Sequence, residues 1–210
     1  MTKTEPQQTT KRSRGSDPKE TVIRAAMPLF ARFGFRKTSV DELARAARVS
    51  KATIYAHFDS KEEIFAEVVR SEGTQAFAIM DTAVAEASGF DGKLKAFFES
   101  FLDAITASEL LQQASSEVVA ELLPLAQEVD SELEDEGFAR LRELVIEGVE
   151  AGEIEVVDDI DTTARALQLA ALSLHLACLD RDKTRVRRDL PTLLDLLLRG
   201  LRASPGPRGN

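Results

Sequence analysis

The chain has 210 residues, a net charge of −9 and an isoelectric point near 4.9. Such an acidic balance does not, for the chain as a whole, suggest nucleic-acid binding, and its single cysteine excludes a disulfide-stabilised scaffold. No apolar run predicts a signal segment or a membrane-spanning helix, so we expect a cytoplasmic protein without a membrane partner.

The N-terminal segment is basic and polar. Residues 1–16 contain Lys11, Arg12 and Arg14 among Gln, Thr and Pro residues, so we expect a disordered arm. Such an arm can reach a phosphate or the minor groove of DNA. Its composition fits a solvated tail equally well, and both interpretations stay open.

Four helix starts fall within the first 60 residues. Asp17 suits the N-cap of the first helix, because a proline follows at the first helical position. Ser39 and Glu42 have the spacing of a capping box, in which two side chains satisfy free N–H groups at a helix start. Further N-caps are expected at Ser50 and Ser60.

The helix that begins after Ser50, and that we expect to end near His57, is too short to be stable alone. Apolar residues of the flanking helices recur at helical spacing and can enclose Ile54. The outward face then presents a cation, a hydroxyl, a phenol and an imidazole, which together fit a major groove. This face consists of Lys51, Ala52, Thr53, Tyr55 and His57.

The order of small, apolar and polar residues in this region is specific. It contains the run Ala26-x-x-Leu29-Phe30-x-x-x-Gly34-Phe35-x-x-Thr38-Ser39-Val40-x-x-Leu43-Ala44-x-x-Ala47-x-Val49-Ser50-x-x-x-Ile54-Tyr55-x-His57-Phe58-x-Ser60-Lys61-Glu62. Over about residues 20–67 the chain therefore resembles the N-terminal domain of the TetR family of bacterial transcriptional regulators. The resemblance implies an all-helical homodimer whose C-terminal domain binds a small molecule and then releases DNA.

The resemblance also implies roles for single residues. Phosphate contacts are expected from Thr38, Tyr55, His57 and Lys61. Base contacts are expected mainly from Lys51, Ala52 and Thr53. Ser39, at the start of the second helix, completes the predicted DNA-binding set.

Two positions depart from the family pattern. Arg48 stands where the turn before the third helix usually has glycine, and a left-handed backbone there would cost Arg about 1–2 kcal/mol. Ala56 stands where a second aromatic residue is frequent. The base preference of the family therefore does not transfer to this chain. Pro28 should kink the first helix.

Charge separates the two parts of the chain. Up to Arg70 there are 14 Lys and Arg against 9 Asp and Glu, whereas the remaining 140 residues have 13 against 27. The first third is therefore basic enough to suggest a nucleic-acid partner, and the rest is strongly acidic.

The remainder of the chain predicts five or six further helices and no strand, for about nine in all. Breaks are expected near Gly73, Pro124, residues 88–92, Ser108, residues 152–161 and residues 181–189. The alternating segment 153–157 is interpreted as a loop because three aspartates follow it closely. We expect an all-α protein with a disordered arm over 1–16, a DNA-binding domain over 17–67, a helical ligand-binding and dimerisation domain over 68–203, and a disordered tail over 204–210.

Two C-terminal helices are rich in apolar residues. The segment 164–179 is apolar on almost every side, and the last helix carries a broad leucine face. Paired with their copies across a two-fold axis they would form a four-helix interface, as the resemblance also implies; burial within one domain is the alternative. The predicted interface consists of Leu169, Leu172, Leu176, Leu190, Leu194, Leu197 and Leu201.

A ligand cavity is expected between the other C-terminal helices. Aromatic and aliphatic side chains with a few polar groups could line it and would suit a small apolar or amphipathic molecule. Any one of the aromatic residues could equally be ordinary core. The predicted lining is Phe98, Phe101, Leu102, Gln112, Ser115, Phe138, Gln168 and His175.

Enzymatic or metal-sensing chemistry is the alternative function. His175 and Cys178 are spaced to share a helix face, and Asp182 follows one turn later. One cysteine and one available histidine cannot make an ordinary structural zinc site, and no glycine-rich phosphate loop occurs. We therefore predict no metal, no cofactor and no catalytic site, and favour a repressor that leaves a palindromic operator when its ligand binds.

Overall fold

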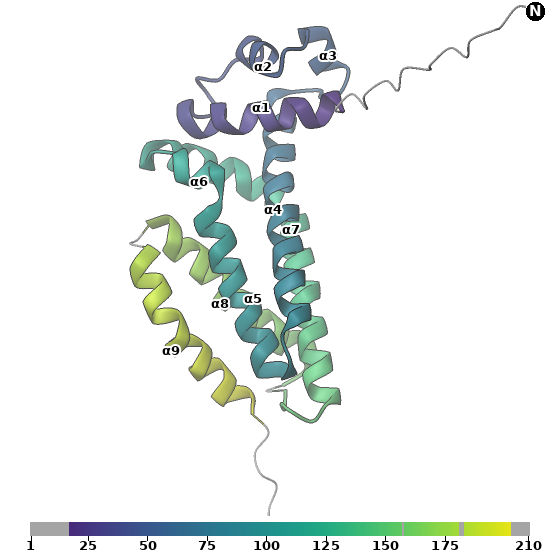
Figure 1. Cartoon of the computed structure of the whole chain (residues 1–210), viewed down its shortest axis with the longest axis vertical. Helices are drawn as coiled ribbons and strands as arrows, with labels where there is room; N and C mark the ends of the chain where they lie inside the picture. Colours follow the sequence, from purple (N-terminus) through teal and green to yellow (C-terminus); the bar gives the residue numbers. More distant parts are fainter. Residues whose placement is uncertain (1–16, 157, 181–182, 203–210) are drawn as a thin grey trace, which may run out of the picture.

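The computed structural model describes residues 17–156, 158–180 and 183–202, which form nine helices and no strand (Figure 1). The all-α prediction is thereby confirmed. The predicted arm and tail lie outside the described residues. None of the described helices is long and apolar enough to cross a membrane.

Three helices form the N-terminal end of the molecule (Figure 1): α1 (Pro18–Phe33), α2 (Val40–Ala47) and α3 (Lys51–Tyr55). Their starts agree with the predictions. Asp17 Oδ1 accepts a hydrogen bond from the backbone N–H of Lys19 at 3.0 Å. Ser39 and Glu42 form both halves of a capping box. Ser50 Oγ accepts from Thr53 N at 3.0 Å.

Other local details differ from the expectation. The third helix ends at Tyr55, and His57 follows in a turn that its N–H closes by donating to Ile54 O at 3.0 Å. Ser60 does cap the next helix. The Glu63 carboxylate accepts a hydrogen bond from the backbone N–H of Asp59, the residue before this N-cap, at 2.6 Å.

The long helix α4 (Lys61–Glu86) joins the N-terminal end to the rest of the molecule (Figure 1). The break predicted near Gly73 is wrong, because α4 continues through it. A Cβ at Gly73 would lie 2.6 Å from Cδ2 of Leu133, so the glycine permits a close approach between α4 and a later helix. This glycine is required by packing and does not end the helix.

The other helices are α5 (Gly89–Ala107), α6 (Glu109–Gln113), α7 (Ser116–Glu150), α8 (Ile160–Asp180) and α9 (Lys183–Leu201). The break predicted near Pro124 is also wrong, since α7 continues past it. Proline removes one intrahelical hydrogen bond. The helix α7 packs against α4 and α8, and such tertiary contacts can offset that loss. The helix α9 begins at Lys183, inside the break expected over 181–189, so residues 183–189 are helical.

Burial divides the molecule into two hydrophobic cores. The N-terminal core contains Phe30, Ile54 and Phe65, and it also takes in Leu110 of α6 and Leu122 of α7. The second core joins α4, α5, α7, α8 and α9. The short helix α6 packs against both α1 and α5, so it lies between the two parts.

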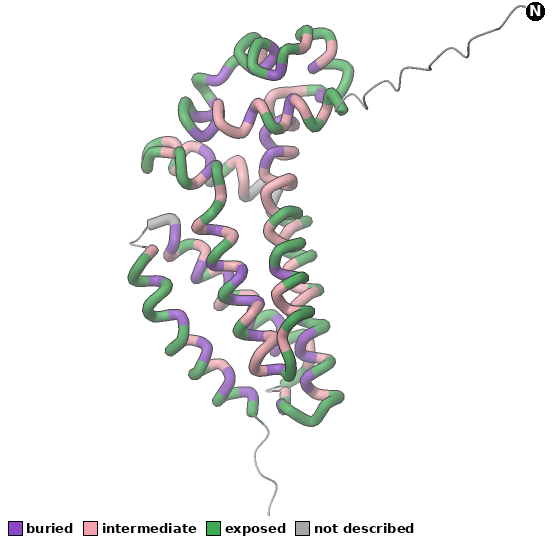
Figure 2. Tube along the Cα trace, viewed as in Figure 1, coloured by how far each residue is buried: buried purple, intermediate pink, exposed green. Residues whose placement is uncertain are grey.

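The leucines of α9 correct the predicted dimer interface. Buried positions recur along α9 (Figure 2), and they include Leu190, Leu194 and Leu201. These three side chains belong to the core that α9 shares with α5 and α8 of the same chain. Their placement on an exposed interface was therefore wrong. The apolar face of α9 covers its own domain, as the alternative interpretation required.

The segment after α7 is a loop, as predicted. Ile154 in this loop forms an isolated antiparallel bridge with Arg202, and Glu155 N donates to Leu201 O at 2.9 Å. The loop thus fixes the end of α9 against the end of α7.

Candidate functional site

The outer surface of α3 is anchored from beneath by a single residue. Ile54 is fully buried, whereas Lys51, Ala52, Tyr55 and His57 are exposed. Tyr55 exposes 56% of its surface although it is a large aromatic residue. One buried side chain thus anchors the short helix, and Lys51, Ala52 and Tyr55 face the solvent.

Two residues of the predicted base-reading set already have polar partners. Lys51 Nζ lies 2.7 Å from Asp41 Oδ1 of α2 in an exposed ion pair. Thr53 Oγ1 and Ser50 Oγ are 2.8 Å apart. An exposed ion pair contributes little to stability, so Lys51 can leave Asp41 at small cost.

Thr38 is placed differently from the expectation. Its side chain is 2% exposed, and its hydroxyl donates to Gly34 O at 2.7 Å. In this structure Thr38 closes the loop between α1 and α2. The hydroxyl is therefore not the exposed phosphate ligand that the resemblance implied.

Lys61 is also committed to the fold. Its ammonium donates to the carbonyl oxygens of Phe35 at 2.7 Å and Thr38 at 2.9 Å. The same group lies 4.1 Å from the centre of the Phe35 ring, within the range of a cation–π contact. Lys61 therefore braces the loop before α2, a role that the sequence interpretation, which made it a phosphate ligand, did not include.

Further exposed cations lie next to these residues, and two of them, Arg36 and Lys37, were not among the predicted DNA contacts. Arg36 and Lys37 are exposed in the loop directly before the capping box of α2. Arg48, at the end of α2, is exposed and has φ 56° and ψ 41°. The backbone at Arg48 is thus left-handed, the conformation for which a steric cost was expected. The adjacent pair at 36 and 37 was visible in the sequence but was counted only in the net charge.

The loop before α2 is tied to the C-terminal helices. Glu121 Oε1 of α7 accepts a hydrogen bond from the backbone N–H of Arg36 at 2.6 Å. Gly34, at φ +82°, passes so close that a Cβ there would lie 2.8 Å from Glu121 Oε2. Within the core, the rings of Phe35 and Phe65 meet edge to face with centroids 5.9 Å apart.

A cavity of about 250 Å³ lies among α4, α5, α6, α7 and α8. Of the eight predicted lining residues, Phe101, Gln168 and His175 line it. Phe98 and Leu102 are fully buried in the core and do not line it. The remaining three predicted residues, Gln112, Ser115 and Phe138, do not line the cavity either.

Three misplacements have identifiable causes. Gln112 is exposed and donates to Thr106 O at 2.9 Å. Ser115 serves as the N-cap of α7. Phe138 lies beneath the guanidinium of Arg165, 4.7 Å from ring centroid to Cζ. The prediction also missed Phe65 and Glu72 of α4, which do line the cavity.

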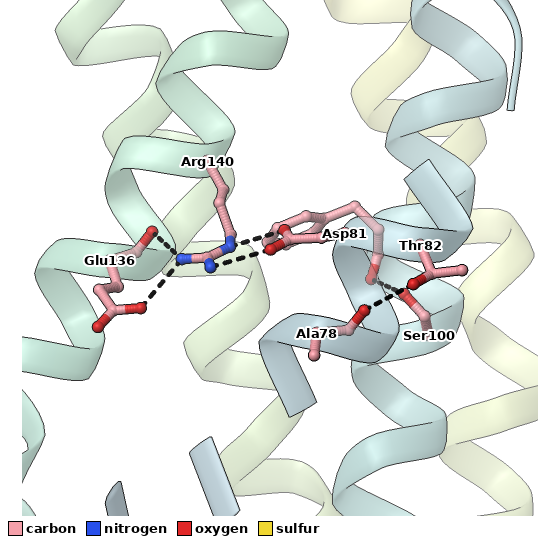
Figure 3. A network of polar contacts seen from close by, with 7 residues as sticks. Ala78, Asp81, Thr82, Ser100, Glu136 and Arg140 are labelled. Atoms are coloured by element: carbon pink, nitrogen blue, oxygen red, sulfur yellow. Dashed lines mark hydrogen bonds and ion pairs between the residues drawn. The ribbon is translucent and has the colours of Figure 1, made fainter. Parts of the chain in front are cut away.

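An ion-pair network joins α4 to α7 beside the cavity (Figure 3). Arg140 binds both carboxylate oxygens of Asp81 at 2.8 and 3.1 Å and one oxygen of Glu136 at 3.2 Å. Hydrogen bonding to Asp81 raises the pKa of the Arg140 guanidinium further above its ordinary value. The guanidinium also lies 4.1 Å from the ring centre of Phe77, a residue of the cavity wall.

Asp182, the third residue of the predicted group, lies outside the described residues; among the described ones, His175 and Cys178 do not form a recognisable metal or catalytic centre. The His175 ring meets Phe101 edge to face at 6.2 Å, and burial lowers the pKa of the imidazole. Burial raises the pKa of the Cys178 thiol, which disfavours the reactive thiolate. Within the described residues, no group of three or more His, Cys, Asp or Glu side chains is arranged to hold a metal ion.

Large apolar side chains remain exposed on α8 and α9. Leu169 and Leu176 of α8 expose 64% and 55% of their surface, and Leu196 of α9 exposes 64%. Leu172 and Leu197 are half-buried. Leu196 was missing from the predicted interface because it falls outside the leucine face used for the prediction.

Comparison with known proteins agrees with this architecture. Residues 22–68 match the model of the bacterial regulatory proteins of the tetR family. The chain is 27% identical over 183 residues to the uncharacterised HTH-type transcriptional regulator YhgD of Bacillus subtilis, a match that covers 86% of this chain and 93% of that protein. It is 36% identical over 52 residues to IcaR of Staphylococcus aureus, the negative transcriptional regulator of the biofilm operon icaADBC. That second match covers 25% of this chain and 28% of IcaR.

The fold also occurs in solved structures. The fatty acid degradation regulator FadR from Bacillus halodurans superposes with a TM-score of 0.65 at 21% identity, covering 94% of this chain and 100% of that chain. At this identity the likeness shows the fold alone.

Proposed function

Because this chain is a transcriptional regulator of the TetR family, we propose that it is a ligand-responsive repressor that binds a palindromic DNA operator as a homodimer. The observation that carries the proposal is the outer surface of α3, where Lys51, Ala52 and Tyr55 are exposed and buried Ile54 anchors the helix. The description of IcaR as a negative regulator supports repression as the direction of control.

The proposed DNA interface lies on one end of the molecule. Lys51, Ala52 and Thr53 would contact base edges in the major groove, because they lie at the N-terminal end of an exposed helix. Backbone phosphates would be contacted by exposed groups around that helix, which are Arg36, Lys37, Ser39, Tyr55 and His57. Thr38 and Lys61 would position the loop from within.

The proposed homodimer would pair α8 and α9 with their copies. Exposed Leu169, Leu176 and Leu196, with half-buried Leu172 and Leu197, offer apolar surface on these two helices. Two protomers related by a two-fold axis would then bring these helices together in a four-helix interface. It would also place two copies of α3 about one helical turn of DNA apart, roughly 34–36 Å, or a multiple of it.

The proposed domain division is a DNA-binding part over residues 17–67 and a ligand-binding part over 68–203. Ligand release of DNA is supported by continuity between the cavity and the loop before α2. Phe65 lines the cavity and packs against Phe35, which precedes the exposed cations. A ligand that prefers one position of α4 would shift the population of the dimer toward that position.

The experiment is selection of DNA by the full chain from a random-sequence pool, followed by affinity measurements at two salt concentrations. We expect enrichment of a two-fold symmetric site, and the affinity of the chain for this site should fall as the salt concentration rises. Lys51→Ala should weaken binding to that site. Enrichment of no sequence, or equal binding of enriched and random DNA, would overturn the proposed function.

A further inference from the structure

We propose that the cavity takes a lipophilic organic cation, with one apolar body and one ammonium group, and that Glu72 is the carboxylate that recognises it. The inference rests on the proposed function, because it names the class of ligand to which the regulator responds.

The walls of the cavity suit an apolar body. Phe65, Phe97 and Phe101 line it together with aliphatic side chains such as Met80. Aromatic rings also attract a cation through their electron-rich faces. The volume, about 250 Å³, lies just below the range of roughly 300–1,000 Å³ that is usual for small-molecule sites, so it fits a small ligand.

The charges on the lining select against an anion. The described lining residues include the carboxylates Glu72 and Glu134 but no lysine or arginine. His175, the remaining titratable residue there, is kept neutral near pH 7 because burial lowers the pKa of its imidazole. A carboxylate or phosphate ligand would therefore lose its hydration without gaining an opposite charge.

Arg140 stands outside this lining. Its guanidinium stacks on the ring of Phe77, 4.1 Å from the ring centre, and Arg140 does not line the cavity. It forms ion pairs with Asp81 and Glu136 (Figure 3). Its guanidinium is therefore unavailable to an anion in the cavity.

Glu72 is held in place by two uncharged donors. Its Oε2 accepts from the Ser108 hydroxyl at 2.8 Å, and its Oε1 accepts from the backbone N–H of Leu110 at 3.2 Å. Both donors orient the half-buried carboxylate, and neither neutralises it. Among the described residues no ion pair involves Glu72, so a ligand ammonium would supply the missing opposite charge.

The position of Glu72 also connects the ligand to the DNA-binding end. Glu72 belongs to α4, and its two partners lie at the start of α6, which packs against α1. A cation beside Glu72 would therefore lie next to the start of α6, which connects the cavity to the N-terminal core.

The test uses three probes that share one naphthalene body: 2-(1-naphthyl)ethylamine, 2-(1-naphthyl)ethanol and 1-naphthylacetate. At pH 7 the first is a cation, the second is neutral and the third is an anion. Their dissociation constants for the full-length wild-type chain are measured by calorimetry. The amine should bind about tenfold more tightly than the alcohol, and the acetate should bind more weakly than both.

Two variants assign the effect to one carboxylate. Glu72→Gln should remove about tenfold of the amine affinity and leave the alcohol nearly unchanged. The matched control is Glu134→Gln, because Glu134 lies on the same lining but is exposed, and it should change neither. Thermal unfolding shows whether Glu72→Gln is folded, and the wild-type comparison needs no variant.

The proposal is overturned if the acetate binds as tightly as the amine or if none of the probes binds. Equal loss of amine affinity in both variants would overturn the assignment to Glu72. Operator binding of the ligand-free chain is measured in parallel. If the ligand-free wild-type chain binds no operator, the proposed function is contradicted. The order of the three probe affinities tests this inference alone.

Discussion

The Nζ atom of Lys61 lies 2.7 Å from the carbonyl oxygen of Phe35 and 4.1 Å from the centre of the Phe35 ring. One side chain of α4 thus holds the loop that leads into α2 by its backbone and by its aromatic ring. The exposed cations Arg36 and Lys37 follow Phe35 directly. Their position relative to α3 therefore depends on Lys61.

Lys61→Ala should lower the free energy of unfolding by about 1–2 kcal/mol, because two carbonyl oxygens lose a charged donor. It should also weaken operator binding while leaving the salt slope of log affinity nearly unchanged. The matched control is Lys37→Ala, an exposed cation, which should lower that slope by about 0.9 with little change in stability. If Lys61→Ala leaves the free energy of unfolding unchanged and lowers the salt slope by a full unit, Lys61 is instead a phosphate ligand.

Arg48→Gly should be mildly stabilising, by less than about 1 kcal/mol, in urea unfolding. The residue has φ 56°, which costs a side chain steric strain, while glycine loses more backbone entropy on folding. Arg48→Ala keeps the strain and removes the charge. If Arg48 binds a phosphate, both variants lose affinity and salt dependence together; a loss in only one of them would contradict that contact.

Leu176→Glu should convert the dimer to monomers and abolish operator binding, because a charge would be buried in the proposed α8–α9 interface. Leu176 is a better choice than Leu197 because the Leu176 side chain is exposed, so its replacement leaves folding of the protomer intact. Leu197 is half-buried against the core of its own protomer. Ile79→Glu is the matched control, as Ile79 is 55% exposed but lies on α4. Sedimentation should show a monomer for the first variant and a dimer for the second. A dimer with normal operator affinity for Leu176→Glu would disprove this interface.

His175 should make stability fall as the pH drops below about 6.5. Burial lowers the pKa of the imidazole in the folded chain, so the unfolded chain binds the proton first. Stability is therefore complete above the ordinary pKa and is lost as pH falls toward the folded-state value. His175→Gln should lack this part of the pH dependence in urea unfolding measured from pH 5 to 8. The same slope in both proteins would contradict the assignment.

Helix starts were predictable because their determinants are local. Ser39 and Glu42 lie three residues apart, and the hydrogen bonds that they form depend on that spacing alone. The left-handed backbone at Arg48 was considered because glycine usually stands at this position in the family pattern, and φ is 56° there. Breaks at Gly73 and Pro124 were predicted wrongly, because packing between distant helices decides whether a weak helix former is tolerated.

The candidate site was predictable where side chains simply point outward. Tyr55 and His57 are exposed as the periodicity of the third helix indicated. The Lys61 ammonium binds backbone carbonyls 26 and 23 residues away, which the tertiary fold brings close and no local spacing encodes. The Thr38 hydroxyl binds Gly34 O four residues back, in a loop whose shape the helical periodicity does not describe. The cavity depends on five helices at once, so Glu72 could not be placed on its wall from sequence alone.

Base reading by α3 is decided by measuring the base preference of a Thr53→Val variant on the selected operator. Affinities of wild type and variant are compared for every single-base change in one half-site. We expect the preference to change at one or two adjacent positions by about 1–3 kcal/mol, while Lys37→Ala weakens all sites alike. An unchanged preference profile for Thr53→Val, with the same affinity for the operator, would show that α3 does not read the bases through Thr53.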